Sequence, residues 1–357
     1  MTRVLLVKMS SLGDVVHALP AVTDAARRGF TFDWVVEESF AAIPALHPAV
    51  ATVLPIAWRR WRSRLWSARG ALVEFRRRLR VRRYDLALDA QGLIKSAVVT
   101  AMARADVRAG FAPGSARERP ATLAYARQIP VAVDHHAVHR QRTLFAAALG
   151  YPLPDHAPDF GLSRDASGAA VPGTRDAAPE CVLLHGTTWP SKHYPEPFWM
   201  ALGAEARAAG FAVGLPAGSP AEAARAGRIA AAVGAVPWPR TGLSELLPRL
   251  ARARLVIGVD SGLLHLAAAL GRPSLGLYGS TDSARTGCLG PRAQHLQAEF
   301  PCAPCRARAC HYRGQPVAAA RGLGSALATG SIEPPCFISL PPEMVWSRAL
   351  RLLAAPA

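Results

Sequence analysis

The three lysines of this chain each lie in a short segment of small and polar residues that could do chemistry. Lys8 lies in KMSSLGDVVHALPA, Lys95 in DAQGLIKSA and Lys192 in HGTTWPSKHYPEPFW, whereas every other one of the 42 basic side chains is an arginine. An arginine side chain is a fixed planar fork, and a lysine side chain is a compact, mobile point charge. The bias fits base composition, but it draws attention to three segments where a point charge would serve better than a fork.

The segment VIGVDSGLLHLAAALGRP predicts an anion-binding site. An apolar strand ends at Asp260, Ser261 and Gly262 form a small turn, and a helix begins, so backbone N–H groups and the helix dipole suit a diphosphate. Gly262 lets a phosphate approach closely, and His265 lies one turn further on the same helix face. The alternative is an ordinary strand–turn–helix connection in which Ser261 only caps the helix.

The segment HGTTWPSKHYPEPFW repeats this arrangement after a strand that ends at Leu184. Thr187, Thr188 and Lys192 form a set of donors for phosphate oxygens, and Lys192 would bring a full charge to a leaving group. The Pro-Glu-Pro tripeptide that follows predicts a helix start. The alternative for Lys192 is a plain surface cation.

The segment KMSSLGD places Asp14 at or near a helix start, after a strand at residues 4–7 and a turn at 10–13. A carboxylate there could act only as an N-terminal helix charge. It could also act as a general base that takes a proton from an acceptor hydroxyl. The residues by themselves leave both roles open.

Several motifs are absent from the sequence. It contains no GxxxxGK[ST] loop and no GxGxxG after the first strand, which removes the basis for an ATPase or a dehydrogenase. It also contains no Asp-x-Asp pair, which argues against a transferase that neutralises a diphosphate through a carboxylate-held metal. We therefore expect the protein's own donors to carry this charge, with no cofactor required.

Short apolar runs alternate with amphipathic stretches, and this cadence predicts an α/β fold with two doubly wound parallel sheets. Proline, glycine, aspartate and serine gather around residues 155–179, a candidate linker. Each strand's carboxyl end would open on a cleft between the domains. We expect one domain at 1–165, a second at 178–340 with an insertion at about 299–336, and a final helix at 341–357. The expected strands are 4–7, 32–36, 53–56, 86–89, 181–184, 212–215, 255–259 and 274–278.

Composition sets limits on the class of protein. A chain of 357 residues with 50% hydrophobic and 19% charged residues favours two folded domains over disorder. It has neither an apolar run long enough to span a membrane nor a signal-peptide layout, so we expect a cytosolic protein. Its formal charge of +17 predicts an anionic partner.

The basic excess is concentrated in residues 58–83, which hold eleven arginines and one acid, Glu74. Trp58, Trp61 and Trp66 are interleaved with the arginines. This pattern predicts contact with phosphates or headgroups at an anionic membrane face. A solvated helix face is the alternative.

The C-x2-C-x4-C spacing of Cys302, Cys305 and Cys310, with Cys336 later in the chain, is a possible metal-binding pattern. His311 adds another metal-ligating side chain. A structural zinc or cluster site is one hypothesis, although paired C-x2-C knuckles are missing. The favoured interpretation is a set of reduced thiols that brace a loop, with no metal at the site.

Several blocks of this chain together resemble the bacterial lipopolysaccharide heptosyltransferases of glycosyltransferase family 9, most closely its type I members. The blocks are SSLGD with HALPA, FDWVVEE, DAQGLIKSA, the Thr-Thr and Lys-His-Tyr-Pro-Glu block, and VDSGLLHLAAAL. The resemblance implies a GT-B architecture with two Rossmann-like domains, the first for the acceptor and the second for the nucleotide sugar. It further implies that the final helix packs back on the first domain. The implied reaction is an inverting transfer of L-glycero-D-manno-heptose from ADP-heptose to Kdo-lipid A at the cytoplasmic face of the inner membrane.

The resemblance also assigns roles to residues. Asp14 would be the base, and Lys192 would hold the diphosphate and assist its departure. Glu222 would lie at the ribose or adenine. The residues expected to bind the nucleotide sugar are Thr187, Thr188, Lys192, Glu222, Asp260, Ser261, Gly262 and His265. Those expected to bind the acceptor are Ser10, Ser11, Gly13, Arg59, Arg60, Gln91, Lys95 and Arg117.

Two alternative functions remain at this point, and the oligomeric state stays open. Another family 9 transferase would add a second heptose or a later residue to an already heptosylated core. An arginine-rich nucleic-acid-binding protein would show steep salt dependence and no affinity for ADP. No RRM, KH or helix-turn-helix signature supports the latter, so we expect no nucleic-acid partner.

Overall fold

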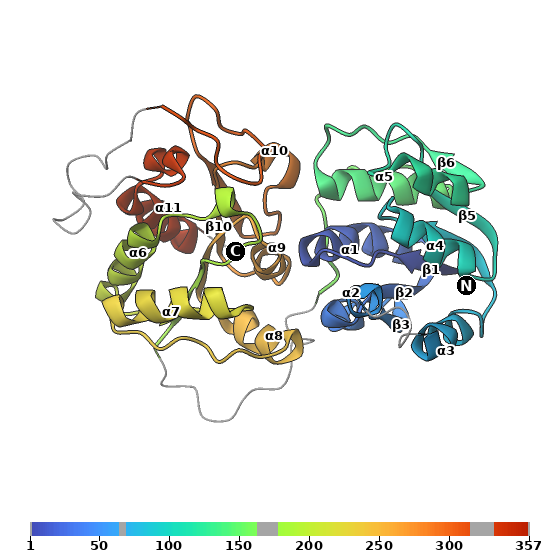
Figure 1. Ribbon diagram of the computed structural model, residues 1–357, viewed down its shortest axis with the longest axis horizontal. Coiled ribbons are helices and arrows are strands. Elements are labelled where there is room, and N and C mark those ends of the chain that lie inside the picture. Colours follow the sequence, from blue (N-terminus) through green and yellow to red (C-terminus); the bar gives the residue numbers. More distant parts are fainter. Residues whose placement is uncertain (1, 64–68, 163–177, 315–331, 356–357) are drawn as a thin grey trace. The chain divides into compact units, whose positions relative to one another are not determined.

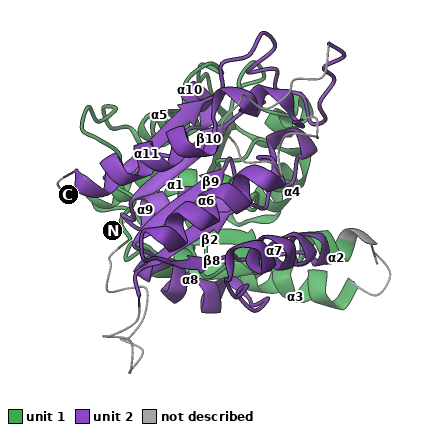
Figure 2. Ribbon diagram, turned by 90° about the vertical axis from the view of Figure 1, so that its left-hand side faces the viewer, with its two compact units in different colours: residues 1–166 green, residues 167–357 purple. Residues whose placement is uncertain are grey.

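The computed structural model describes residues 2–63, 69–162, 178–314 and 332–355. The chain divides into two compact units, Met1–Ala166 and Ser167–Ala357 (Figure 2). Trp66, most of the candidate linker and part of the insertion lie outside the described residues. Among the residues that are described, no helix combines the length and the apolar character needed to cross a bilayer.

The first unit is built on a six-stranded parallel sheet with the order β3-β2-β1-β4-β5-β6 (Figure 1). Helices cover both faces of such a sheet, which explains why Val4–Val7 of β1 are completely buried. The strands are β1 (Arg3–Val7), β2 (Thr31–Glu37), β3 (Val50–Ile56), β4 (Tyr84–Asp89), β5 (Ala105–Phe111) and β6 (Arg127–Ile129). The helices are α1 (Leu12–Ala26), α2 (Trp58–Ser63), α3 (Arg69–Leu79), α4 (Ile94–Met102) and α5 (Ala137–Leu149).

The strand order of the first sheet reverses between β1 and β4. The chain runs outward from β1 to β3 on one side and from β4 to β6 on the other, so the connections diverge at this point. Ligands of doubly wound sheets bind where the strand order reverses, outside the carboxyl ends of the strands. Val7 lies opposite Asp89 in the register, so the two segments that follow these strands start side by side.

The second unit has a five-stranded parallel sheet with the order β11-β10-β9-β7-β8. Its strand order reverses between β7 and β9, where Leu184 lies opposite Gly258. The strands are β7 (Glu180–Leu184), β8 (Ala212–Gly214), β9 (Leu255–Val259), β10 (Ser274–Tyr278) and β11 (Ala293–Gln297). The helices are α6 (Glu196–Ala208), α7 (Pro220–Val233), α8 (Leu243–Arg252), α9 (Gly262–Ala269), α10 (Ser283–Thr286) and α11 (Pro342–Ala354).

The final helix joins the core of the second unit. The helix α11 packs against α6, β9 and β10 of the second unit, and Val345, Trp346, Ala349 and Leu352 join that unit's core. The ring of Trp346 makes an edge contact with Phe211, with centroids 6.0 Å apart. Whether this segment also packs back on the first domain stays a prediction. A parallel sheet needs apolar cover on both faces, and α11 supplies part of that cover here.

Two tryptophans of the arginine-rich segment at residues 58–83 pack on the core of the first unit. Trp58 and Trp61 are partly buried and pack on the core of the first unit. Trp61 makes an edge contact with Phe75 of α3, with ring centroids 5.8 Å apart. Core packing accounts for these two side chains, so they do not by themselves indicate a membrane interface.

Candidate active site

Asp14 lies in the first turn of α1, the helix that follows β1 where the strand order reverses between β1 and β4. Its Oδ2 atom accepts hydrogen bonds from the Ser11 backbone N–H at 2.9 Å and from the Ser11 hydroxyl at 2.8 Å. Its Oδ1 atom lies 3.8 Å from the Lys8 ammonium, and 31% of the side chain is exposed. One carboxylate oxygen thus caps the helix while the other remains available to a substrate hydroxyl.

The charges around Asp14 keep it ionised. Burial by itself would raise the pKa of this carboxyl, but the Lys8 ammonium, the Ser11 N–H and Arg117 outweigh that effect and lower the pKa to about 2. Lys8 is only 4% exposed and donates a hydrogen bond to the Ala90 carbonyl at 2.9 Å. Sequence reasoning gave Lys8 no role, although its rarity as a lysine was the signal that marked its segment.

Gln91 fixes the turn that precedes Asp14. Its Oε1 atom accepts from the Met9 N–H at 2.7 Å and the Ser10 N–H at 3.3 Å, and its Nε2 donates to the Ser10 carbonyl at 2.8 Å. Gly13, also expected at the acceptor site, is buried in the first turn of α1. The structure therefore places the Gln91 amide against the backbone of the Ser10 turn.

Asp89 supports this arrangement and was missed by sequence reasoning. Its Oδ1 atom accepts from the backbone N–H groups of Gln91 at 2.8 Å and Gly92 at 3.0 Å. Its Oδ2 atom accepts from the Tyr125 hydroxyl at 2.7 Å. Gly92 has a φ of +69°, a backbone conformation that side chains rarely allow. The position of Asp89 at a strand end was the available signal.

The basic residues expected at the acceptor site lie around the same turn. Lys95 donates a hydrogen bond from Nζ to the Ser10 hydroxyl at 2.7 Å. Arg117 is exposed and close enough to influence the pKa of both Lys8 and Asp14.

The two arginines of α2 occupy separate positions beside this cluster. The backbone N–H of Arg59 donates to Glu37 at 3.2 Å, and its guanidinium influences the pKa of Lys95. Arg60 forms an ion pair with Glu38 at 3.1 Å. Hydrogen bonds thus join Gln91 and Lys95 to the Ser10 turn, Arg59 and Arg117 lie within electrostatic reach of it, and Arg60 is paired to an acid.

Asp260 is the centre of a polar cluster in the second unit, where the strand order reverses between β7 and β9. Its Oδ2 atom lies 2.7 Å from the Lys192 ammonium, and its Oδ1 atom lies 3.4 Å from His265 Nε2. Its backbone carbonyl accepts from the Thr187 hydroxyl at 3.0 Å. Burial would raise the pKa of Asp260, but His265 and Lys192 outweigh it and lower that pKa. The ionised Asp260 thus holds Lys192 and His265 through its carboxylate and Thr187 through its backbone carbonyl.

The start of α9 has the geometry of an anion site. Ser261 precedes the helix with extended backbone angles, and Gly262 is the first helical residue. The Ser261 hydroxyl is buried and has no hydrogen-bond partner within the described part of the chain. Lys192 also lies over the Trp189 ring, with Nζ 4.5 Å from the ring centroid. Thr188 is exposed in the bend after β7.

Glu222 lies beside the same strand end. Its backbone N–H donates to the Ser219 hydroxyl at 3.2 Å, which caps α7, and its carboxylate accepts from the Gly218 N–H at 2.7 Å. A β-carbon at Gly186 would lie only 2.7 Å from the Glu222 carboxyl carbon, so Gly186 permits this approach. The structure thus brings Glu222 next to the segment that carries Thr187.

Arg225 and His193 complete this side of the site and were not assigned from the sequence. Arg225 donates to His193 Nδ1 at 2.6 Å and to the His185 carbonyl at 3.3 Å. A guanidinium can only donate, so the shorter contact favours a neutral His193 with Nδ1 as acceptor, whereas the 3.4 Å contact of Nδ1 with the His185 carbonyl would need a proton on this atom. Burial and Arg225 lower the pKa of His193, which favours this neutral form. Arg225 lies one helical turn after Glu222, and that spacing was the available signal.

A comparison with protein families identifies the family of this chain. The profile of glycosyltransferase family 9 (heptosyltransferase) matches residues 72–315, which is more than half of the chain. The chain belongs to glycosyltransferase family 9. This confirms the resemblance drawn from the motifs, including the two parallel, Rossmann-like sheets that it implied.

Individual members of family 9 are similar over most of their length. The Lipopolysaccharide heptosyltransferase 1 of Pseudomonas aeruginosa is 49% identical over 359 residues, which cover 99% of each chain. The structure of the E. coli heptosyltransferase WaaC with ADP-2-deoxy-2-fluoro heptose matches with a TM-score of 0.74 and 40% identity, covering 84% of this chain and 94% of that one. E. coli ADP-heptose lps heptosyltransferase II shares the fold, with a TM-score of 0.69, 19% identity and 99% coverage of both chains.

Proposed function

We propose that this chain transfers L-glycero-D-manno-heptose from ADP-heptose to a Kdo residue of the lipopolysaccharide inner core, with Kdo-lipid A as acceptor. The observation that supports this proposal most directly is the charged group found in each unit where the order of its strands reverses. One presents an ionised carboxylate, and the other presents a lysine ammonium beside a helix start. The identity to enzymes named Lipopolysaccharide heptosyltransferase 1 and the heptose analogue bound to WaaC support this donor and this acceptor.

The first unit would hold the acceptor. Kdo carries a carboxylate, which Lys95, Arg117 and Arg59 would attract. The attacking hydroxyl would donate a hydrogen bond to Asp14 Oδ1, because Oδ2 is held by Ser11. A carboxyl with a pKa of about 2 is a weak base. The proton would therefore move late, once bond formation to the anomeric carbon has made the hydroxyl acidic.

The second unit would hold the donor. The Lys192 ammonium, the Thr187 hydroxyl and the N–H groups at the start of α9 would contact the diphosphate oxygens. As the new bond forms, the bond from the anomeric carbon to the diphosphate oxygen breaks, and ADP leaves with the electron pair. Donors that are already in position stabilise this charge without reorganisation. The proposal assigns the charge compensation to these groups, with no metal cofactor.

The direct test is a transfer reaction with purified protein. Incubation with ADP-heptose and Kdo-lipid A is expected to add the mass of one heptose to the lipid and to release one ADP for each transfer. A preparation with ADP-heptose and an already heptosylated core serves as the comparison. Transfer to the heptosylated core alone would replace this proposal with the addition of a later heptose.

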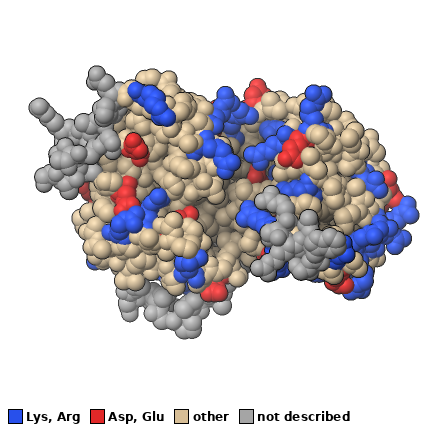
Figure 3. All heavy atoms as spheres, viewed as in Figure 1, with Lys and Arg blue, Asp and Glu red and all other residues tan. Residues whose placement is uncertain are grey.

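We also propose that the protein associates peripherally with the anionic cytoplasmic face of the inner membrane, where a lipid-linked acceptor would be met. The helix α3 exposes apolar side chains beside its arginines, with Leu72 41% and Val73 68% accessible. Arg76 and Arg78 in its last turn are also exposed. Figure 3 shows basic side chains gathered over this part of the first unit. Apolar and cationic groups on one surface helix suit contact with anionic headgroups.

Charge reversal in α3 tests the membrane contact. The double variant Arg76→Glu/Arg78→Glu is expected to bind phosphatidylglycerol-containing vesicles at least about tenfold more weakly, since each basic residue near such a surface contributes about 1 kcal/mol. Co-sedimentation at low ionic strength measures the loss. Arg207→Glu/Arg252→Glu is the matched control, because both residues are exposed in last turns of other helices. Equal binding by both variants would contradict an α3 contact.

A further inference from the structure

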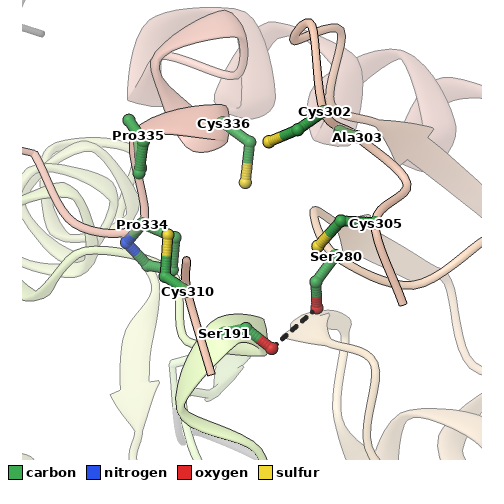
Figure 4. A pocket seen from close by; sticks show the side chains of 9 residues that line it. All are labelled: Ser191, Ser280, Cys302, Ala303, Cys305, Cys310, Pro334, Pro335 and Cys336. Atoms are coloured by element: carbon green, nitrogen blue, oxygen red, sulfur yellow. Dashed lines mark hydrogen bonds between the residues drawn. The ribbon is translucent and has the colours of Figure 1, made fainter. Parts of the chain in front are cut away.

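Four cysteines of the second unit line one small cavity. Cys302, Cys305, Cys310 and Cys336 surround a space of about 10 Å³, together with Ser191, Ser280, Ala303 and two prolines. Figure 4 shows the four sulfur atoms arranged around this common space. All four are free thiols. Residues separated by up to 34 positions in the sequence are thus gathered at one point by the fold.

The lining of this cavity has the chemistry of a site for a soft metal ion. Apart from the four thiols it consists of two serines, an alanine and two prolines, so it contains no charged side chain. A thiophilic metal ion is the cation that soft sulfur ligands select.

We propose that Cys302, Cys305, Cys310 and Cys336 bind one divalent metal ion such as Zn²⁺ through their sulfur atoms. Four-coordinate sulfur sites of this kind are typical of structural zinc, and C-x2-C spacing is common in them. The space is about the size that one water molecule needs, which leaves room for a single ion.

Binding requires a closing movement of the thiols. Among the described residues, no group of three or more His, Cys, Asp or Glu side chains is already placed to hold a metal ion. The ion would therefore draw the sulfur atoms toward the centre of the cavity, to Zn–S distances of about 2.3 Å. Residues 302–310 contain no helix or strand, so no regular hydrogen-bond ladder opposes this movement. Arg306 and Arg308 in the same loop would offset the net negative charge of a tetrathiolate centre.

Hydrogen bonds join the loop at residues 302–310 directly to the turn that carries Lys192. The Ser191 hydroxyl donates to the Ala307 carbonyl at 2.5 Å, and the Ser191 N–H donates to the Arg308 carbonyl at 3.3 Å. The Arg308 guanidinium lies 5.8 Å from the centroid of the Trp189 ring, which also contacts Lys192. A metal that fixed the loop would thus position the lysine turn. This link to donor binding rests on the proposed function, whereas metal binding does not.

Metal analysis of the purified protein tests the site. Protein prepared under reducing conditions without chelator is expected to contain about one equivalent of zinc by mass spectrometry, with iron measured in the same run. Cys310→Ser is the first variant, because Cys310 is exposed and its replacement disturbs packing least. Cys305→Ala/Cys310→Ala is the second, and both are expected to lose the metal. Cys288→Ala, a buried thiol elsewhere in this unit, is the matched control and should keep it.

Two further measurements make the outcome decisive. Chelator-treated protein is titrated with Zn²⁺ against a chromophoric chelator, and its melting temperature is followed with and without the ion. Saturable binding of one equivalent with a rise in melting temperature supports the site, even if a variant fails to fold. Absence of metal from the purified protein together with no binding in the titration would overturn it, as would full metal content in the double cysteine variant.

The positioning role has its own readout. Removing the metal is expected to weaken ADP binding by about tenfold, because Lys192 would then be less well positioned. Small displacements of such a group lower activity by this factor or more. If the ADP affinity is the same with and without the metal, the metal does not position Lys192. That result would not contradict the proposal that the metal binds. Failure of every form to bind ADP would instead count against the proposed function, because zinc stoichiometry is measured independently of it.

Discussion

Replacing Asp14 with asparagine is expected to reduce kcat by about a hundred- to ten-thousandfold, the range that a positioned general base contributes. The amide oxygen of asparagine can still accept the Ser11 hydrogen bonds that cap α1, but it cannot take a proton. The affinity for ADP should stay the same, because the loss falls on the acceptor side. Release of ADP in the presence of ADP-heptose and Kdo-lipid A measures the effect.

A control variant distinguishes a catalytic role of Asp14 from the effect of removing a charge at a helix terminus. Glu245 is an exposed acid in the first turn of α8, so Glu245→Gln removes a comparable helix-terminal charge at a residue that takes no part in the proposed mechanism. Its activity should be unchanged, and both variants should melt within a few degrees of the wild type. Near-normal turnover of Asp14→Asn would reduce Asp14 to a capping residue.

The low pKa of Asp14 sets the pH dependence of this step. A carboxyl with a pKa of about 2 stays ionised at every pH above about 4, so the base form is fully present from pH 5 to pH 8. The kcat/KM profile should therefore show no acidic limb from this group in that range. Replacement of Lys8 by methionine should raise the pKa of Asp14 and move such a limb toward neutral pH. An identical profile in the two proteins would show that Lys8 does not control the ionisation of Asp14.

Replacing Lys192 with alanine is expected to lower kcat/KM by about a hundred- to thousandfold, as removal of one preorganised donor at a developing charge does elsewhere. The variant loses the cation nearest the proposed diphosphate position. It also leaves the Asp260 carboxylate, now without its 2.7 Å partner, to repel that group. Steady-state kinetics with varied ADP-heptose and calorimetric titration with ADP measure the two contributions.

A double variant identifies the cause of this loss. If the unpaired Asp260 carboxylate repels the diphosphate, Lys192→Ala/Asp260→Asn should bind ADP more tightly than Lys192→Ala alone. Coupling of this kind is expected between residues in direct contact. Lys192→Arg keeps the charge but replaces a mobile point charge with a rigid fork, so only partial recovery is expected. Wild-type turnover by Lys192→Ala would remove Lys192 from the mechanism.

The central strands were predictable because buried parallel strands leave a continuous apolar signal. The predicted ranges for β9 (Leu255–Val259) and β10 (Ser274–Tyr278) agree with the structure residue for residue. The strands β5, β6 and β11 were missed. The segment ADVRAGF of β5 contains an arginine, and AQHLQ of β11 is a polar edge strand that is only partly buried. Their strand character depends on pairing with a neighbour, which a local pattern does not record.

The surfaces that helices cover were harder to predict than the helices themselves. The amphipathic pattern gave a helix near residues 341–353, and the structure has α11 at Pro342–Ala354. An apolar stripe shows that a helix must be covered, but it does not show by which sheet. The same reason explains why Trp58 and Trp61 suggested a membrane contact when they pack on the core.

The sequence by itself indicated which residues are candidates for the chemistry, because strand ends, small turns and helix starts are local features. It placed Asp14, Lys192 and the segment after Val259 at such positions, and it separated the chain into two domains of the same kind. Only the tertiary structure decided how these groups act on one another. The pairing of β1 with β4 brings Gln91 and Lys95 to the Asp14 turn, and the pairing of β7 with β9 brings Lys192 to Asp260. Ionisation depends on distances of a few ångströms between residues far apart in sequence, and strand order sets those distances.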